Sequence, residues 1–224
     1  MEPETDTADV YDRYKASSLK AYNDRLPDRY DTAIALRVLR VSVMDDFVIG
    51  ELGSDPSSLA VLDVGCATGR LLERLALAGV RSLAGSDLAP RIVEVARAKL
   101  RRRGFEADLR AADAESELPW PADSFDTVTL TGVLHHFVRP GSAFAEMERV
   151  LRPGGRLIVA DACFFPPVRE FFNLCLRLRP HEGDYHFYTV RQAADLLTDF
   201  GWDVVRCRRL NWWSYGVVCA RGER

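Results

Sequence analysis

The chain has 224 residues, of which 47% are hydrophobic, and a formal net charge of −3 at neutral pH. This length and apolar content suit one α/β domain with a sizeable core, and they exclude a wholly disordered chain. The slightly acidic balance gives no general attraction to nucleic acid or anionic membranes, and the apolar runs are too short to predict a membrane span.

The cysteines and the first residues indicate a cellular compartment. The stretch MEPETDTADVYDR is acidic and polar, unlike a secretory signal. The five cysteines include no Cys-x-x-Cys pair, so reduced thiols are favoured over a disulfide framework or a zinc site. We therefore expect a cytoplasmic protein without a bound metal, and the sequence leaves its oligomeric state open.

Strand and helix patterns alternate along most of the chain. Gly79 and Gly201 stand where helices should end, Pro90 where one should begin, and Thr189 with Gln192 forms a capping box. The alternation predicts an α/β fold with a doubly wound, mostly parallel sheet that ends in an antiparallel hairpin. The predicted elements are strands at 60–64, 81–87, 125–132, 156–161, 202–207 and 214–220, and helices at 70–78, 90–104, 141–151 and 190–200.

The stretch VLDVGCATGR at 61–70 is an apolar strand that breaks into a glycine-rich turn. Its spacing differs from the Gly-x-Gly-x-x-Gly of dinucleotide sites, although Gly65 and Gly69 still let the backbone approach a ligand. Asp63, at the end of the strand, would repel a pyrophosphate and favour a cation. Asp87, at the end of the next strand, suits ribose hydroxyls. We therefore expect a ligand with a ribose and a positive charge rather than NAD.

Five segments in order resemble the motifs of class I S-adenosylmethionine-dependent methyltransferases. They are VLDVGCATG, GSDLAP, AADAESELPWPADSFDTV, LHHF and LRPGGRLIVAD. The chain is most similar to the small-molecule group of the ubiquinone/menaquinone type, over about residues 55–220. The resemblance implies a Rossmann-like fold and S-adenosyl-L-methionine as the cofactor. The pattern departs at Ala67, where the family often has glycine, so we expect Ala67 to keep a φ angle below zero.

The resemblance also assigns a cofactor site. Asp63 and the turn after it would line the methionine part, and Thr131 would lie nearby. Asp87 would hold the ribose hydroxyls with Leu88 near the adenine, while Asp113 would accept from the adenine amino group beside Ala114. The expected cofactor-binding residues are Tyr30, Asp63, Gly65, Cys66, Ala67, Gly69, Asp87, Leu88, Asp113, Ala114 and Thr131.

The segment before the core is similar to a helical lid in these enzymes. Its sequence LPDRYDTAIALRV contains Tyr30, which would touch the methionine moiety, and Tyr14 is the second choice. We expect residues 1–54 to form this N-terminal lid and residues 55–224 to form the cofactor-binding domain.

An aromatic segment at 162–188 follows the strand predicted at 156–161 and is expected as a substrate-covering insertion. It would roof an apolar pocket for a ring-bearing substrate, or it would form a satellite core under a long loop; both interpretations remain open. His136 and His186 are the candidate bases, ahead of Tyr30. One of His135 and His136 would face the substrate while the other caps the following helix.

The combined evidence predicts a methyltransferase that acts on a small, ring-bearing or lipophilic metabolite. No Asp/Asn-Pro-Pro-aromatic signature is present, which argues against methylation of a nucleobase amino group, and we expect no nucleic-acid partner. The alternatives are other chemistry with the same cofactor and a non-catalytic partner subunit. An arsenic methyltransferase would need converging thiols, for which Cys163 and Cys175 are thin support.

Overall fold

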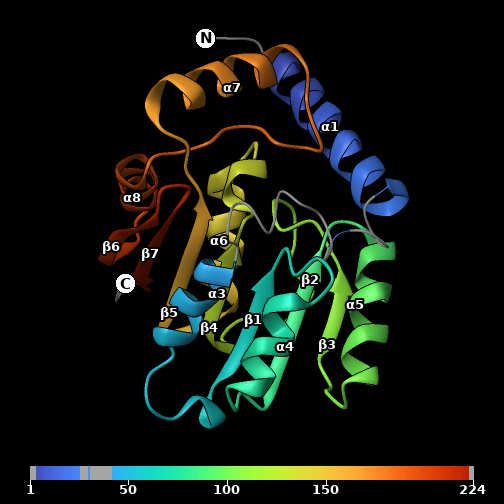
Figure 1. The fold of residues 1–224 in the computed structure, drawn as a ribbon, viewed down its shortest axis with the longest axis vertical. Coiled ribbons are helices and arrows are strands. Elements are labelled where there is room, and N and C mark those ends of the chain that lie inside the picture. The colour runs from blue at the N-terminus through green and yellow to red at the C-terminus, as the bar shows by residue number, and fades with distance from the viewer. Residues whose placement is uncertain (1–3, 26–29, 31–41, 222–224) are drawn as a thin grey trace.

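The computed structural model describes residues 4–25, 30 and 42–221. A seven-stranded sheet with the order β3-β2-β1-β4-β5-β7-β6 forms its centre (Figure 1). β7 is antiparallel to both β5 and β6, and the other neighbouring strands are parallel. The predicted doubly wound sheet with a final hairpin is therefore confirmed. The strands are β1 Ala60–Val64, β2 Ser82–Asp87, β3 Asp108–Ala111, β4 Phe125–Thr131, β5 Leu151–Ala162, β6 Asp203–Asn211 and β7 Ser214–Ala220.

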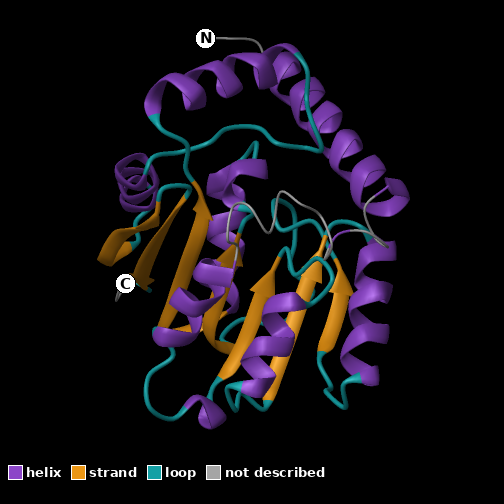
Figure 2. Ribbon diagram, viewed as in Figure 1, coloured by secondary structure: helices purple, strands orange, loops and turns teal. Residues whose placement is uncertain are grey.

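Helices cover both faces of the sheet (Figure 2). Apolar residues of α3, α4 and α5 form one buried cluster on the sheet, and those of α6 and α8 form another. The helices are α1 Glu4–Lys20, α3 Ser42–Gly50, α4 Arg70–Leu77, α5 Pro90–Arg102, α6 Pro140–Val150, α7 Pro166–Leu178 and α8 Val190–Asp199, with short turns η1 Ala21–Arg25, η3 Pro56–Ser58 and η4 Leu134–His136.

Many element boundaries follow local signals, but β3 and α7 were not predicted and β6 is longer than expected. The capping box of α8 is confirmed, because Thr189 accepts from the Gln192 amide and the Gln192 side chain accepts from the Thr189 amide. The sequence RPGG at 152–155 was expected to separate a helix from a strand, but β5 already begins at Leu151. Pairing with β4 shifts between Phe125 and Thr127, and this irregularity accommodates the proline and glycines inside the strand.

Two helices, α1 and α7, lie beyond the carboxyl ends of the parallel strands (Figure 1). The chain after α7 returns beneath it toward α8, between α7 and the strand ends (Figure 2). Asn173 of α7 fixes this return, because its side chain accepts from the Phe187 amide at 2.9 Å and donates to the Phe187 carbonyl at 3.1 Å. No helix among the described residues is long and apolar enough to cross a membrane.

Part of the aromatic segment 162–188 forms a small satellite core, which was the second of the two predicted interpretations. Phe187 is buried in a small cluster with Leu176, against which Phe164 packs. In contrast, the Phe171 side chain of α7 is 64% exposed. Most of this segment therefore lies one layer outside the strand ends.

Candidate functional site

A pocket opens at the carboxyl ends of β1, β2 and β4, beneath α1 and η1. The space between its walls, including its open mouth, is about 590 Å³. Loops after the strands form one wall, and the N-terminal helix forms the other. The lining residues are Lys15, Ser18, Tyr22, Tyr30, Val64, Gly65, Ala67, Ser86, Asp87, Leu88, Ala112, Asp113, Ala114, Gly132, Val133, His136 and Phe137.

The turn after β1 brings main chain to the pocket wall. Gly65 has φ +72°, and a Cβ there would lie 2.3 Å from Cγ2 of Val133, so only glycine fits. Ala67 has φ +45°, which contradicts the expected negative value. This conformation costs an alanine about 1–2 kcal/mol, and it is held by the hydrogen bond from the Ala67 amide to Oδ2 of Asp87, at 3.0 Å.

Asp87 faces the pocket from the end of β2. Its Oδ2 accepts from the Ala67 amide and its Oδ1 accepts from the Ala89 amide, both at 3.0 Å. Burial raises the pKa of this carboxyl, while the two amides oppose the shift. Each oxygen keeps a lone pair for a further donor, so the group can accept two neighbouring hydroxyls of one ligand.

Asp63 is buried behind the turn and lies outside the pocket lining. Its side chain accepts from the Thr129 hydroxyl at 2.8 Å, and burial raises its pKa to about 7. The expected contact with a ligand is therefore absent from the described pocket wall, where main chain at Val64 and Gly65 takes its place. Asp63 thus lies beneath the turn, and its role toward a ligand stays a prediction.

Three other predicted residues also lie behind the wall. Cys66 is 4% exposed, and burial raises the pKa of its thiol well above the usual value. A Cβ on Gly69 would lie 3.3 Å from Cβ of Ala96, so this glycine serves the contact between the turn and α5. Thr131 is the last residue of β4, with a buried hydroxyl that has no hydrogen-bond partner among the described residues.

Asp113 joins the strand-end loops to α1. Its Oδ1 accepts from Nζ of Lys15 at 2.9 Å and from the Glu115 amide at 3.0 Å, and its Oδ2 accepts from the Tyr11 hydroxyl. Burial would raise the pKa of Asp113, but Lys15 and Tyr11 hold it below the usual value. Lys15 also pairs with Glu115, whose side chain is fully buried. A ligand that donates a hydrogen bond to Asp113 would therefore bind the same carboxylate as Lys15 and Tyr11 of α1.

Two adjacent histidines on η4 have opposite proton affinities. Nδ1 of His135 lies 2.6 Å from Oδ1 of Asp161. Burial would lower the pKa of His135, but Asp161 raises it to about 10. Burial and the neighbouring charge of His135 lower the pKa of His136 to about 4. Of the two, His136 lines the pocket, where Tyr22 meets its ring edge-on with the centroids 6.0 Å apart.

The remaining candidates divide between the pocket and its surroundings. Tyr30 lines the pocket, whereas Tyr14 is buried against Tyr185 and donates to the Leu176 carbonyl at 2.5 Å. His186 does not contribute to the described lining; its ring lies 4.6 Å from that of Tyr188, centroid to centroid. Leu88 and Ala114 lie on the wall as expected in position, and their roles stay predictions.

Sequence reasoning missed the contribution of α1 and η1. Lys15, Ser18 and Tyr22 all line the pocket, and their spacing of three and four residues would place them on one helix face. That spacing was a usable signal, but nothing local links it to a ligand. Asp161 and Asp184, which contact the histidines, were also missed because their partners are distant in the sequence.

Comparisons with known proteins agree on one family. Residues 62–159 match a family model described as "Methyltransferase domain". The chain is 36% identical over 129 residues to a demethylmenaquinone methyltransferase from Thermus thermophilus, covering 57% of each chain. It is 37% identical over 149 residues to a ubiquinone biosynthesis O-methyltransferase from Xanthomonas axonopodis pv. citri, covering 63% of this chain and 60% of the relative. The chain thus spans about three-fifths of the length of these curated relatives.

The fold is shared with solved structures. A SAM-dependent methyltransferase from Aquifex aeolicus superposes with a TM-score of 0.65, over 80% of this chain and 89% of the other. Sequence identity in that pair is 21%, so the similarity establishes the fold alone.

Proposed function

We propose that the protein methylates a small molecule, because residues 62–159 match the methyltransferase-domain model and the chain shares the fold of a solved SAM-dependent methyltransferase. The substrate class that we propose is a lipophilic, ring-bearing metabolite related to quinones. The names of the two curated relatives support this class. Within this proposal, residues 1–54 act as the lid and residues 55–224 as the catalytic domain.

The pocket fits S-adenosyl-L-methionine. Gly65 presents main chain where a side chain could not stand, and Asp87 offers two acceptor oxygens from one wall. Asp87 would hold the ribose hydroxyls, Leu88 and Ala114 would flank the adenine, and Asp113 would accept its amino group. Tyr30 and the turn at Gly65 would contact the methionine part.

The charges in the pocket favour this cofactor over a phosphate-bearing nucleotide. The carboxylates of Asp87 and Asp113 line the described wall, and its one lysine, Lys15, is paired with Asp113 and Glu115. An anionic pyrophosphate would meet uncompensated negative charge there, whereas a sulfonium and an ammonium would be attracted.

The cofactor would supply a methyl group that its sulfonium has already activated. The chain must then position the acceptor and provide a group that takes the acceptor's proton. His136 is neutral at neutral pH, since its pKa is lowered to about 4, and it stands on the pocket wall. Oδ1 of Asp184 lies 3.4 Å from Nδ1 of His136. A neutral imidazole has one unprotonated nitrogen, which could accept a proton from the substrate.

The observation that carries the proposal is the position of Asp87 beside the left-handed turn at Gly65 and Ala67. Calorimetry should detect binding of S-adenosylhomocysteine and no comparable binding of NADH. Incubation with labelled S-adenosylmethionine and a set of short-chain demethylquinols and catechols should yield a methylated product by mass spectrometry. Saturable NADH binding without S-adenosylhomocysteine binding would overturn the cofactor assignment, and labelling of only polar acceptors would overturn the substrate class.

A further inference from the structure

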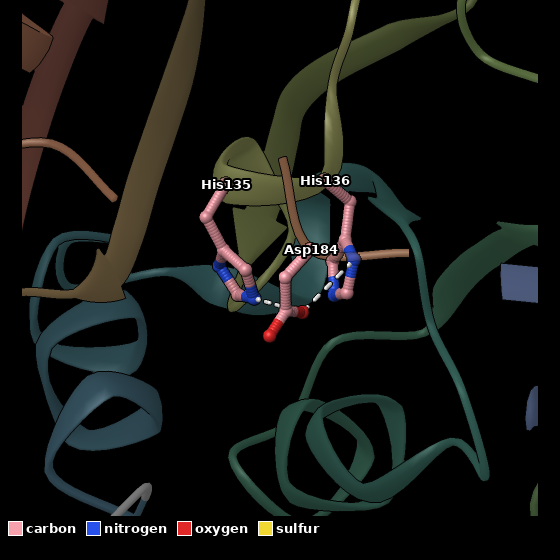
Figure 3. A group of neighbouring side chains, drawn as sticks. All are labelled: His135, His136 and Asp184. Carbon is pink, nitrogen blue, oxygen red and sulfur yellow. Dashed lines mark ion pairs between the residues drawn. The ribbon is translucent and has the colours of Figure 1, made fainter. Parts of the chain in front are cut away.

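Three side chains converge beside the pocket from two separate segments (Figure 3). His135 and His136 come from η4, and Asp184 comes from the chain that returns beneath α7. Each can offer one ligand atom so that all these atoms lie within 4.8 Å of one another. Oδ1 of Asp184 lies 3.5 Å from Nε2 of His135 and 3.4 Å from Nδ1 of His136.

We propose that His135, His136 and Asp184 bind a divalent transition-metal ion, with Zn²⁺ as the best match. In tetrahedral zinc sites the metal lies about 2.0–2.1 Å from nitrogen and oxygen ligands, which places the ligand atoms about 3.3–3.4 Å apart. The two separations from Asp184 are close to this value. Two imidazoles and one carboxylate also form a common ligand set of zinc sites that keep an open position.

The surroundings of His135 resemble the outer shell of a metal site. Asp161 is fully buried, accepts from the His135 amide at 2.9 Å and contacts Nδ1 of the ring. Phe187 stacks on the other side, with ring centroids 4.8 Å apart. These contacts fix the ring so that Nε2 faces Asp184, which is the carboxylate–histidine–metal arrangement.

The surroundings of His136 supply a second, independent observation. Its Nδ1 is buried and has no hydrogen-bond partner among the described residues, because the contact with Oδ1 of Asp184, at 3.4 Å, lacks hydrogen-bond geometry. A buried polar atom without a partner is unusual in a folded protein. A metal ion between His136 and Asp184 would give this nitrogen its missing partner.

Main-chain bonds hold the two segments together without an ion. The amides of Tyr185 and His186 both donate to the His135 carbonyl, at 2.8 and 3.0 Å. Gly183, with φ +88°, turns the chain immediately before Asp184. The ligands are therefore positioned before any metal binds, so little ordering is required on binding.

The neighbouring charges suit a doubly charged cation. Asp161 and Asp184 carry two negative charges beside the imidazoles, and a divalent ion on Nε2 of His135 would take the place of the proton held there. Because His136 also lines the pocket, the open position would take an oxygen donor such as a phenol or enol of the substrate. This role rests on the proposed methyl transfer, whereas metal binding does not. With an ion on Nδ1, His136 would position the substrate rather than accept its proton.

The test uses the full chain, treated with a chelator and desalted. Titration with Zn²⁺ against a chromophoric indicator should give one site per chain, and Co²⁺ should give the visible spectrum of tetrahedral coordination. Asp184→Asn and His135→Gln should each lose about 100-fold or more in Zn²⁺ affinity, while Asp161→Asn should lose about 10- to 100-fold. His181→Gln is the matched control, because His181 is exposed on the same loop, and its affinity should stay unchanged.

Binding of S-adenosylhomocysteine by each variant separates loss of the metal site from loss of the fold. Absence of saturable Zn²⁺ binding to the wild-type chain, or equal binding by all variants that retain cofactor affinity, would overturn the metal site. Zn²⁺ binding without any methyl transfer would leave the metal site in place and overturn the proposed function instead. Full activity in chelator-treated protein would overturn the substrate-holding role.

Discussion

The two halves of the pocket are built by different means. The strand-end half consists of the turn after β1 and the end of β2, where main-chain amides of Ala67 and Ala89 hold Asp87. The cover half consists of α1, η1 and the return segment 179–188. Side chains attach α1 to the strand ends, and the return segment adds main-chain bonds to the His135 carbonyl. Its bond between Lys15 and Asp113 joins residues 98 positions apart.

This difference in construction predicts that the geometry of the strand-end half tolerates less variation than that of the cover half. Main-chain bonds depend on the strand register and survive most substitutions, so the strand-end half is a rigid receptor for one ligand. Ion pairs and ring contacts depend on individual side chains, so the cover half can change with the substrate. We therefore expect substitutions in the strand-end half to change cofactor affinity, and substitutions at the cover to change turnover or stability.

The largest expected effect is on turnover, at the junction of the two halves. His136→Ala should lower turnover by about 10²–10⁴-fold while changing S-adenosylhomocysteine affinity little, because the ring lines the pocket and, in our proposal, serves the acceptor. His186→Ala is the matched comparison and should stay within a few-fold, since its ring lies outside the described lining. Steady-state kinetics and calorimetry would measure both. Turnover within a few-fold of wild type in both variants would show that positioning alone drives the reaction.

The next effect is on cofactor affinity, in the strand-end half. Asp87→Ala should weaken S-adenosylhomocysteine binding by about 1.5–3 kcal/mol, because two charge-assisted hydrogen bonds to ribose are lost. Asp195→Ala on the outer face of α8 is the control, as Asp195 is exposed, and calorimetry should show no change. Undiminished affinity in Asp87→Ala would remove this residue from the binding site and weaken the contrast between the halves.

A smaller effect is expected on stability, where the cover is attached. Lys15→Ala should lower the free energy of unfolding by about 1–3 kcal/mol, because the buried Glu115 carboxylate loses its cation. For a chain of this size that corresponds to about 2–4 °C in Tm per kcal/mol. Lys20→Ala, at the exposed end of the same helix, should leave Tm unchanged in scanning calorimetry. The same Tm for both variants would mean that ion pairs do not attach α1.

The last effect is a pH dependence of stability that arises from Asp63, beneath the turn. The pKa of Asp63 is about 7 in the folded protein, above the value of about 4 expected when the chain unfolds. The folded state thus keeps a proton that the unfolded state releases, and this stabilisation is complete below pH about 4 and lost as the pH rises toward 7. The slope is at most about 1.4 kcal/mol per pH unit.

Asp63→Asn isolates this contribution. The stability difference between wild type and variant, measured by denaturant unfolding without cofactor, should shift in favour of the variant as the pH rises from about 4 to about 7. Asp195→Asn should run parallel to wild type over the same range. A constant difference between wild type and Asp63→Asn would show that Asp63 titrates normally.

The strand-end half was largely predictable because its signals are local. Periodicity located the strands, and the glycines of the turn and Asp87 stand at fixed distances from strand ends. Two particulars failed for reasons of geometry: Ala67 takes a left-handed conformation to reach Asp87, and Asp63 points behind the turn instead of into the pocket. A sequence gives the position of a residue along a strand more easily than the direction of its side chain.

The cover half was predictable only in outline. A helical lid was expected, but its pocket-lining residues Lys15 and Tyr22 carry no local pattern that links them to Asp113 or His136. The aromatic residues of 162–188 indicated burial near the strand ends, yet much of their surface belongs to α7, one layer further out. Contacts between distant segments depend on the whole fold. Composition could therefore indicate that these segments cover the strand ends, but it could not tell which of their residues line the pocket.

The buried Cys66 thiol has a consequence for the lifetime of the protein. A methyl donor bound at the turn would stand beside a sulfur atom, and thiolates are strong nucleophiles toward activated methyl groups. Here burial keeps the sulfur protonated and leaves it 4% exposed, on the inner side of the turn that presents main chain to the ligand. With S-adenosylmethionine bound as we propose, this burial would protect the thiol from methylation by the cofactor.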